Sequence, residues 1–237
     1  MIPLRSVELD KTETDPNEFP WNLPAVSSLD RLEFTKPVTF LVGENGSGKS
    51  TLIEAIAVAT GLNAEGGTKN LRFQERSTES ELDKHLSLAW DKRPQSSFFL
   101  RAETFFNMAS AYEQAGSPNP DPMVELHFQS HGQQFLTAMR ERFGPGGLFL
   151  MDEPESALSF TSQLALLRVM HEYSASGSQF IVATHSPILL AFPEATIWHL
   201  DQDGMRTVTW DTAPPVTEMQ AFLADRGLYL HHLFNDD

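Results

Sequence analysis

Apolar runs and amphipathic stretches alternate along most of the chain, which favours an α/β fold. Runs rich in β-branched and aromatic residues predict strands in "RLEFTKPVTFLVG" (31–43), "SSFFLRAETFF" (96–106), "LFLM" (148–151) and "QFIVA" (179–183). Residues 49–61 and 159–177 space their apolar positions as helices do, and a glycine ends each stretch. Strands and helices in this order predict a mostly parallel central sheet covered by helices.

Two stretches give more detailed expectations. The second helical stretch brings four large apolar residues near one face, which we expect to be buried: Phe160, Leu164, Leu167 and Met170. Residues 195–210, "ATIWHLDQDGMRTVTW", place an Asp-Gly pair between two alternating runs, a pattern that predicts a β-hairpin.

The alternation breaks between about residues 62 and 140. This polar and charged segment contains a proline-rich loop, "EQAGSPNPDPMV", and a short helical stretch, "QQFLTAMRERFG". We therefore predict one domain over residues 1–237, with about 62–140 as an inserted mixed or helical subdomain between 1–61 and about 145–237.

Composition narrows the class of protein. The chain has 237 residues, 41% of them hydrophobic, which suffices for a sizeable core. Its apolar runs are too short to form a transmembrane segment, and the N-terminus lacks the features of a secretory signal. With no cysteine, we expect a cytoplasmic chain. The net charge of −15 does not support direct nucleic-acid binding, because phosphates would repel it.

The glycine-rich segment after the first strands matches the phosphate-loop pattern Gly43-x-x-x-x-Gly48-Lys49-Ser50. Glycines let backbone N–H groups turn toward phosphate oxygens, Lys49 reaches the β- and γ-phosphates, and Ser50 offers a hydroxyl to Mg²⁺. The alternative is a flexible turn with a solvated lysine. The strand predicted before the loop and the helix predicted after it disfavour this alternative. The expected ATP contacts are Gly43, Glu44, Asn45, Gly46, Ser47, Gly48, Lys49, Ser50 and Thr51.

Two carboxylates follow the apolar strand of "LFLMDEPE". Asp152 is expected to hold Mg²⁺, and Glu153 to polarise the attacking water. His185, at the end of the next apolar strand, can donate a hydrogen bond to the γ-phosphate. Taken alone, Asp152 and Glu153 could be solvated acids at a strand end, and His185 could be a structural histidine. The phosphate loop upstream favours a catalytic role for all three. The predicted catalytic residues are Glu153, His185 and Lys49.

These segments together resemble the ABC-type ATPases. "GENGSGKST" resembles their Walker A motif, "LFLMDEPESALS" their Walker B motif and catalytic glutamate, "THSP" their switch histidine, and "SHGQQF" (130–135) their signature. The resemblance implies a P-loop NTPase fold of ABC type with an N-terminal antiparallel β portion and an inserted helical subdomain. It also implies a head-to-tail homodimer around ATP, in which Ser130, Gly132 and Gln133 of one copy complete the site of the other.

The sequence departs from the family pattern at several points. The signature reads Gln-Ser-His-Gly-Gln, and Ser159 stands where an aspartate is common. No glutamine marks the Q-loop, so Glu103 and Arg101 are substitutes for it. These features resemble the small stand-alone "AAA family" branch, related to the heads of chromosome-maintenance and DNA-repair ATPases and to overcoming-lysogenization-defect nucleases.

Three functions remain open at this point. The first is an ATPase that uses ATP and Mg²⁺, dimerises with a second copy and couples its nucleotide state to an unidentified protein partner. The second is a nucleotide-gated regulatory module of a DNA-repair or phage-defence complex, with little hydrolysis of its own. The third, the energy subunit of a membrane transporter, is disfavoured because the Q-loop glutamine is missing.

Overall fold

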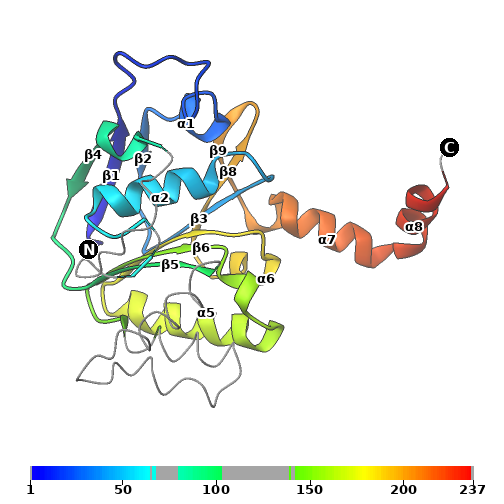
Figure 1. Cartoon of the computed structure of the whole chain (residues 1–237). Coiled ribbons are helices and arrows are strands. Elements are labelled where there is room, and N and C mark those ends of the chain that lie inside the picture. The colour runs from blue at the N-terminus through cyan, green and yellow to red at the C-terminus, as the bar shows by residue number, and fades with distance from the viewer. Residues whose placement is uncertain (1, 65, 68–79, 103–138, 140–141, 236–237) are drawn as a thin grey trace, which may run out of the picture.

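The computed structural model describes residues 2–64, 66–67, 80–102, 139 and 142–235, and every structural statement below concerns this part of the chain. The elements in chain order are β1 (Leu4–Leu9), α1 (Pro24–Ser27), β2 (Arg31–Glu33), β3 (Val38–Gly43), α2 (Lys49–Ala59), η1 (Leu82–His85), β4 (Leu86–Trp90), β5 (Ser97–Arg101), β6 (Leu148–Asp152), η3 (Pro154–Ala157), α5 (Phe160–Ala175), β7 (Gln179–Ala183), α6 (Pro187–Leu190), β8 (Thr196–Asp201), β9 (Gly204–Val208), η4 (Trp210–Thr212), α7 (Pro214–Ala224) and α8 (Arg226–Phe234) (Figure 1).

The central sheet has six strands in the order β5-β6-β7-β3-β8-β9. All its pairs are parallel except the hairpin of β8 and β9. Every residue of β3, β6 and β7 is buried, as expected for parallel strands with both faces covered. The predicted mostly parallel α/β fold and the hairpin at residues 195–210 are therefore confirmed.

A second, antiparallel sheet has the order β2-β1-β4 and supplies the expected N-terminal antiparallel portion. β4 and β5 fall within the predicted insert at residues 62–140, yet β4 pairs with β1 and β5 pairs with β6. These described strands thus belong to the two sheets. The rest of the insert, including most of the predicted helix at 133–144, lies outside the described residues.

Two hydrophobic cores lie on opposite faces of the central sheet. Phe149 and Phe180 point into one core, which α5 and α6 cover. Leu150 and Ile181, one position further along the same strands, point into the other core, which α2 and the antiparallel sheet cover. Figure 1 shows α2 above the sheet and α5 below it. Successive side chains of a strand point to opposite faces, so an uninterrupted apolar run fills both cores at once.

The expected buried face of α5 was wrong at its N-terminal end. Phe160 and Leu164 are 64% and 46% exposed, whereas Leu166, Val169 and Met170 are buried against the sheet. The apolar positions of this helix form a band wider than one face. The sheet covers the side on which 166, 169 and 170 lie, so the first turn extends past its edge.

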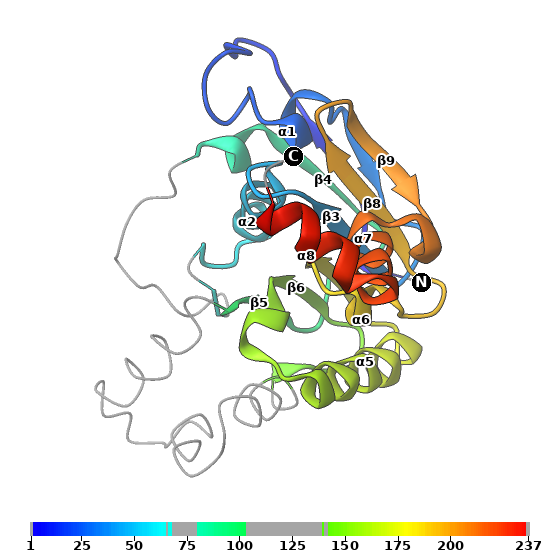
Figure 2. The same cartoon turned by 90° about the vertical axis from the view of Figure 1, so that its right-hand side faces the viewer.

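The last two helices were not predicted. α7 and α8, here called the C-terminal arm, project away from the sheet (Figure 1). Seen from the right-hand side of that view, α8 lies in front of the body (Figure 2). No described helix combines the length and the apolarity needed to cross a bilayer.

The side chain of Gln179 joins the two sheets. Its Oε1 accepts the backbone N–H of Leu4 at 2.8 Å, and its Nε2 donates to the Leu4 carbonyl at 3.0 Å. Gln179 is fully buried at the start of β7, and Leu4 is the first residue of β1. Leu4 lies opposite Trp90 of β4, but the pairing of β1 with β2 begins only at Ser6. The amide therefore satisfies one donor and one acceptor of a buried backbone position beyond the end of that pairing.

Replacement of Gln179 with alanine should destabilise the chain. Two buried backbone groups lose their partner, so we expect Gln179→Ala to lower the free energy of unfolding by about 2–4 kcal/mol in urea denaturation. Gln95→Ala is the control, because that side chain is exposed, and should change it by less than about 0.5 kcal/mol. Equal effects of the two variants would contradict the bridging role.

Candidate functional site

The geometry of the loop between β3 and α2 explains the two glycines of the phosphate-loop pattern, Gly43 and Gly48. A Cβ on Gly43 would lie 2.2 Å from the carbonyl oxygen of Leu200 on β8, which is far too close. Gly48 has a φ of +96°, a left-handed conformation that strains other residues. The close approach to β8 and the left-handed turn therefore explain these two positions of the phosphate-loop pattern.

Lys49 begins α2 and is buried. Its Nζ donates to the carbonyl oxygens of Gly43 at 2.7 Å and Glu44 at 2.9 Å, which fold the side chain back over the loop. Burial lowers the pKa of Lys49, and the nearby carboxylates of Glu153 and Asp152 partly offset this. The ammonium group thus lies within the loop, between backbone carbonyls and acidic side chains.

Ser50 and Asp152 meet across the edge of the sheet. The Ser50 Oγ donates to Asp152 Oδ1 at 3.0 Å. Asp152 is buried at the last position of β6. Arg101, which ends β5, donates to Glu54 Oε2 at 3.1 Å, and its Nε lies 3.9 Å from Asp152 Oδ2. The structure thus brings together two predicted metal ligands that are 102 positions apart in the sequence.

Glu153 and His185 face each other beyond these strand ends. Glu153 has a φ of +46°, which is uncommon for a residue with a side chain and marks a sharp turn after β6. Its Oε1 lies 3.8 Å from His185 Nε2. The Nε2 atom is buried and has no hydrogen-bond partner among the described residues. Burial, then the charge of Lys49, lowers the pKa of His185 below its ordinary value of 6.5, so the imidazole is neutral at pH 7.

Glu155 is a site residue that the sequence analysis missed. Its Oε1 accepts the backbone N–H of His185 at 2.6 Å and so fixes the turn that carries the imidazole. Burial raises the pKa of Glu155, and the hydrogen bond from His185 opposes that rise. The sequence did contain a signal for Glu155, because it is the third carboxylate of "DEPE", directly after a buried strand. Its partner is a backbone group, which leaves no trace in sequence.

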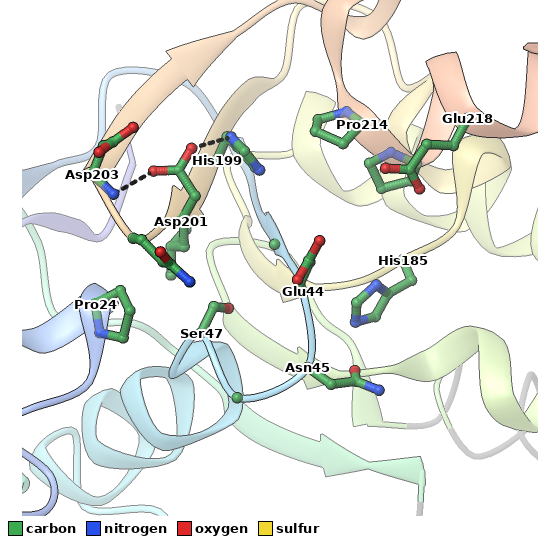
Figure 3. A pocket seen from close by; sticks show the side chains of 15 residues that line it. Pro24, Glu44, Asn45, Ser47, His185, His199, Asp201, Asp203, Pro214 and Glu218 are labelled. Carbon is green, nitrogen blue, oxygen red and sulfur yellow. Dashed lines mark hydrogen bonds and ion pairs between the residues drawn. The ribbon is translucent and has the colours of Figure 1, made fainter.

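A cavity of about 510 Å³ opens beside the phosphate loop (Figure 3). The first part of the loop lines one side, and His185, the end of β8 and the start of α7 line the rest. Among the described lining residues four are acidic and none is lysine or arginine: Glu44, Asp201, Asp203 and Glu218. Lys49 and Ser50 do not line it. The acidic lining of this cavity would repel a phosphate, whereas Lys49 and Ser50 lie on the inner side of the loop, next to Asp152.

Several predicted residues cannot be placed in this geometry. Ser130, Gly132 and Gln133 of the expected signature lie outside the described residues, as does Glu103 of the expected Q-loop. Arg101 is placed, and it contacts Glu54 and Asp152 as described above.

The donor set at the strand ends fits Mg²⁺. A hydroxyl from Ser50 and a carboxylate from Asp152 are hard oxygen ligands, the kind that Mg²⁺ binds beside phosphates. The two oxygens already lie within hydrogen-bond distance of each other. One small cation could therefore contact both.

Two protein-family models match the chain in adjacent segments. One, described as "AAA domain", matches residues 25–135. The other, described as "AAA domain, putative AbiEii toxin, Type IV TA system", matches residues 133–191. Their matched spans include the phosphate loop, the two carboxylates after β6 and His185.

Curated relatives are ATP-binding proteins. The chain is 28% identical over 166 residues to the cytochrome c biogenesis ATP-binding export protein CcmA of Rhodopseudomonas palustris, covering 66% of this chain and 82% of the relative. It is 25% identical to a "probable export ATP-binding/permease protein" of Pseudomonas fluorescens, covering 86% of this chain, and 27% identical to the arabinose import ATP-binding protein AraG 2 of Burkholderia thailandensis, covering 68%. The chain spans only about a third of the length of these last two, 36% and 35%.

Solved structures of ABC transporter proteins share the fold. A nucleotide-free ATP-binding cassette from an ABC transporter matches with a TM-score of 0.50 and 16% identity, covering 97% of this chain and 99% of that one. A metal-chelate type ABC transporter in an inward-facing conformation matches with a TM-score of 0.51 and 17% identity, covering 94% and 90%. At these identities the likeness concerns the fold alone.

The pKa of His185 should respond in opposite directions to its two charged neighbours. Lys49→Met removes a positive charge that disfavours the imidazolium, so we expect the pKa of His185 to rise. Glu153→Gln removes a negative charge that favours it, so the pKa should fall. NMR titration of the imidazole, assigned with His185→Asn, measures both. Shifts of the same sign in the two variants would contradict the geometry of this site.

Proposed function

Because the chain belongs to the ABC-type ATPases, we propose that it binds Mg²⁺-ATP and hydrolyses it by attack of water on the γ-phosphate. The observation that carries this proposal is the hydrogen bond of 3.0 Å between Ser50 and Asp152, beside the buried Lys49. It joins the helix after the phosphate loop to the carboxylate that ends a neighbouring strand. That is the arrangement needed to hold a metal-bound triphosphate.

The loop residues 43–51 would hold the triphosphate through backbone N–H groups at the start of α2. Lys49 would exchange the carbonyls of Gly43 and Glu44 for β- and γ-phosphate oxygens. Ser50 and Asp152 would hold Mg²⁺. When bound, Mg²⁺ neutralises charge on the β- and γ-phosphates.

Glu153 would act as the general base. Its carboxylate accepts a proton from the attacking water, which it can do from the turn just beyond the strand that carries Asp152. The unpaired Nε2 of His185, 3.8 Å from Glu153, would donate a hydrogen bond to the γ-phosphate or to the water. Glu155 would act as a positioning residue, because it fixes the backbone of His185.

A second copy would complete the site. In the ABC-type ATPases that this chain resembles, the signature of one copy contacts the γ-phosphate bound to the other, which assigns Ser130, Gly132 and Gln133 to that role. We expect ATP to join two copies head to tail and hydrolysis to release them. The two AAA-domain matches favour the stand-alone branch, in which dimer closure acts on an unidentified protein partner.

Three observations bear on the alternatives. The family model that matches residues 133–191 is described as a toxin of a type IV toxin–antitoxin system, which favours a nucleotide-gated module within a defence complex. The names of the curated relatives favour the energy subunit of a transporter. Against the transporter, Arg101 ends β5 near the expected Q-loop and is bound to Glu54 of α2. Co-purification with a membrane subunit would support the transporter.

Replacement of Glu153 with glutamine tests the proposal. The amide cannot accept the proton from water, so we expect ATP hydrolysis to fall by about 10²–10⁴-fold. ATP binding should persist, because the ligands of the phosphates and of Mg²⁺ are unchanged. ATP-bound sandwich dimers should then accumulate, because they cannot hydrolyse the nucleotide.

Glu172→Gln on α5 is the matched control, since that side chain is exposed and pairs only with Arg168 in the described residues. Its hydrolysis rate should equal that of the native chain. If Glu153→Gln hydrolyses ATP at the native rate, Glu153 is not the base. If it stops hydrolysis, yet Mg²⁺-ATP does not bring two copies together in a chain that is a monomer without nucleotide, the proposed sandwich dimer is wrong.

A further inference from the structure

The C-terminal arm exposes an unusual amount of apolar surface. Every residue of α8 is exposed, and Val216 is the one buried residue of α7. Large apolar side chains lie on both helices and are between 37% and 73% exposed: Met219, Phe222, Leu223, Leu228, Tyr229, Leu230, Leu233 and Phe234. A helix of nine residues with apolar side chains around it is marginal in water without a partner.

The exposed area is large enough for a stable interface. With about 200 Å² of surface for each large apolar residue, these exposed fractions add up to roughly 900 Å² over all sides of the two helices. A specific interface buries about 800 Å² on each partner, and the largest apolar patch of an ordinary monomer covers about 300–600 Å². Five residues also line a concave cavity of about 490 Å³, into which side chains of a partner helix could insert: Phe222, Tyr229, Leu230, His232 and Leu233.

The root of the arm lies beside the candidate site. Val216 packs in the core that α5 and α6 cover, and Trp210 Nε1, just before α7, donates to the Pro187 carbonyl at 3.0 Å. Pro214 and Glu218 line the cavity next to Glu44 of the phosphate loop (Figure 3). From this root the helices project from the edge of the sheet that carries the phosphate loop (Figures 1 and 2).

The arm carries little of the chain's charge, so charge does not oppose the packing of two arms. The whole chain has a net charge of −15, so two copies repel each other and are also repelled by anionic membranes and nucleic acids. Residues 214–234 contain Glu218, Asp225 and Arg226, a formal charge of −1 with neutral histidines. Two arms can therefore meet with little repulsion while the acidic bodies stay apart. A pair of two-helix arms around a two-fold axis makes a four-helix unit that covers both apolar surfaces.

We propose that the C-terminal arms of two copies pack against each other and form a dimer that exists without nucleotide. This contact goes beyond the proposed function, since it needs neither ATP nor the signature. It holds two phosphate loops in one particle. ATP then closes two sites that are already tethered, at a high effective concentration.

Two substitutions on the arm test the proposal. Light scattering of the native chain without nucleotide should give twice the chain mass of 26.5 kDa. Leu223→Asp combined with Leu233→Asp places charges in the apolar contact, so the dimer dissociation constant should rise by at least about 100-fold. Leu164→Asp is the matched control, because Leu164 is an exposed leucine on α5, outside the arm, and that variant should stay a dimer. Circular dichroism should show that all three chains are folded.

The same variants separate this proposal from the proposed function. With Glu153→Gln added, the arm variant should be a monomer without nucleotide and a dimer with Mg²⁺-ATP if both proposals hold. A native chain that is a monomer without nucleotide overturns the arm contact and leaves the arm to a different protein. An arm variant that remains a dimer without nucleotide also overturns it. If the arm variant with Glu153→Gln is a monomer without nucleotide and remains a monomer with Mg²⁺-ATP, the result counts against the sandwich dimer instead.

Discussion

The parallel pairing of β7 with both β3 and β6 is the constraint on which the rest of the structure depends. Ala183 of β7 lies opposite Leu41 on one side and opposite Asp152 on the other. β6 and β7 therefore end at one level and β3 ends two residues further on, so the chain leaves all three strands at the same edge. Because of this register the phosphate loop, the carboxylates after β6 and the turn of His185 converge, although the sequence separates them widely.

This constraint explains why the candidate site could be predicted better than its surroundings. The predicted groups lie at the ends of β3, β6 and β7 or a few residues after them, and such mostly apolar runs become buried parallel strands whose ends meet. The structure brings Lys49 close enough to Asp152 and His185 to interact with both, and the roles of these residues in binding and catalysis stay predictions. Glu155 was not found, because its partner is a backbone N–H, and Gln179 was not found for the same reason.

The failures in the fold have a common cause as well. Periodicity identified the helix α5, but the band of apolar residues on it was wider than the surface of the sheet, so Phe160 remained exposed. The segment 214–234 was passed over because its apolar residues surround the helices instead of marking one face. A pattern with no single face carries no information about the protein's own core. The exposed apolar surface that results is the basis of the proposed contact between two arms.

The central claim is that Ser50 and Asp152 hold the metal of Mg²⁺-ATP at the edge of the sheet. The most direct measurement is calorimetric titration of the protein with ATP, once in the presence of Mg²⁺ and once in the presence of a chelator. It is made on the native chain and on Asp152→Asn. The native chain should bind ATP more tightly when Mg²⁺ is present. In Asp152→Asn, the factor by which Mg²⁺ lowers the dissociation constant for ATP should be at least about tenfold smaller than in the native chain. An equal gain from Mg²⁺ in both chains would contradict the account.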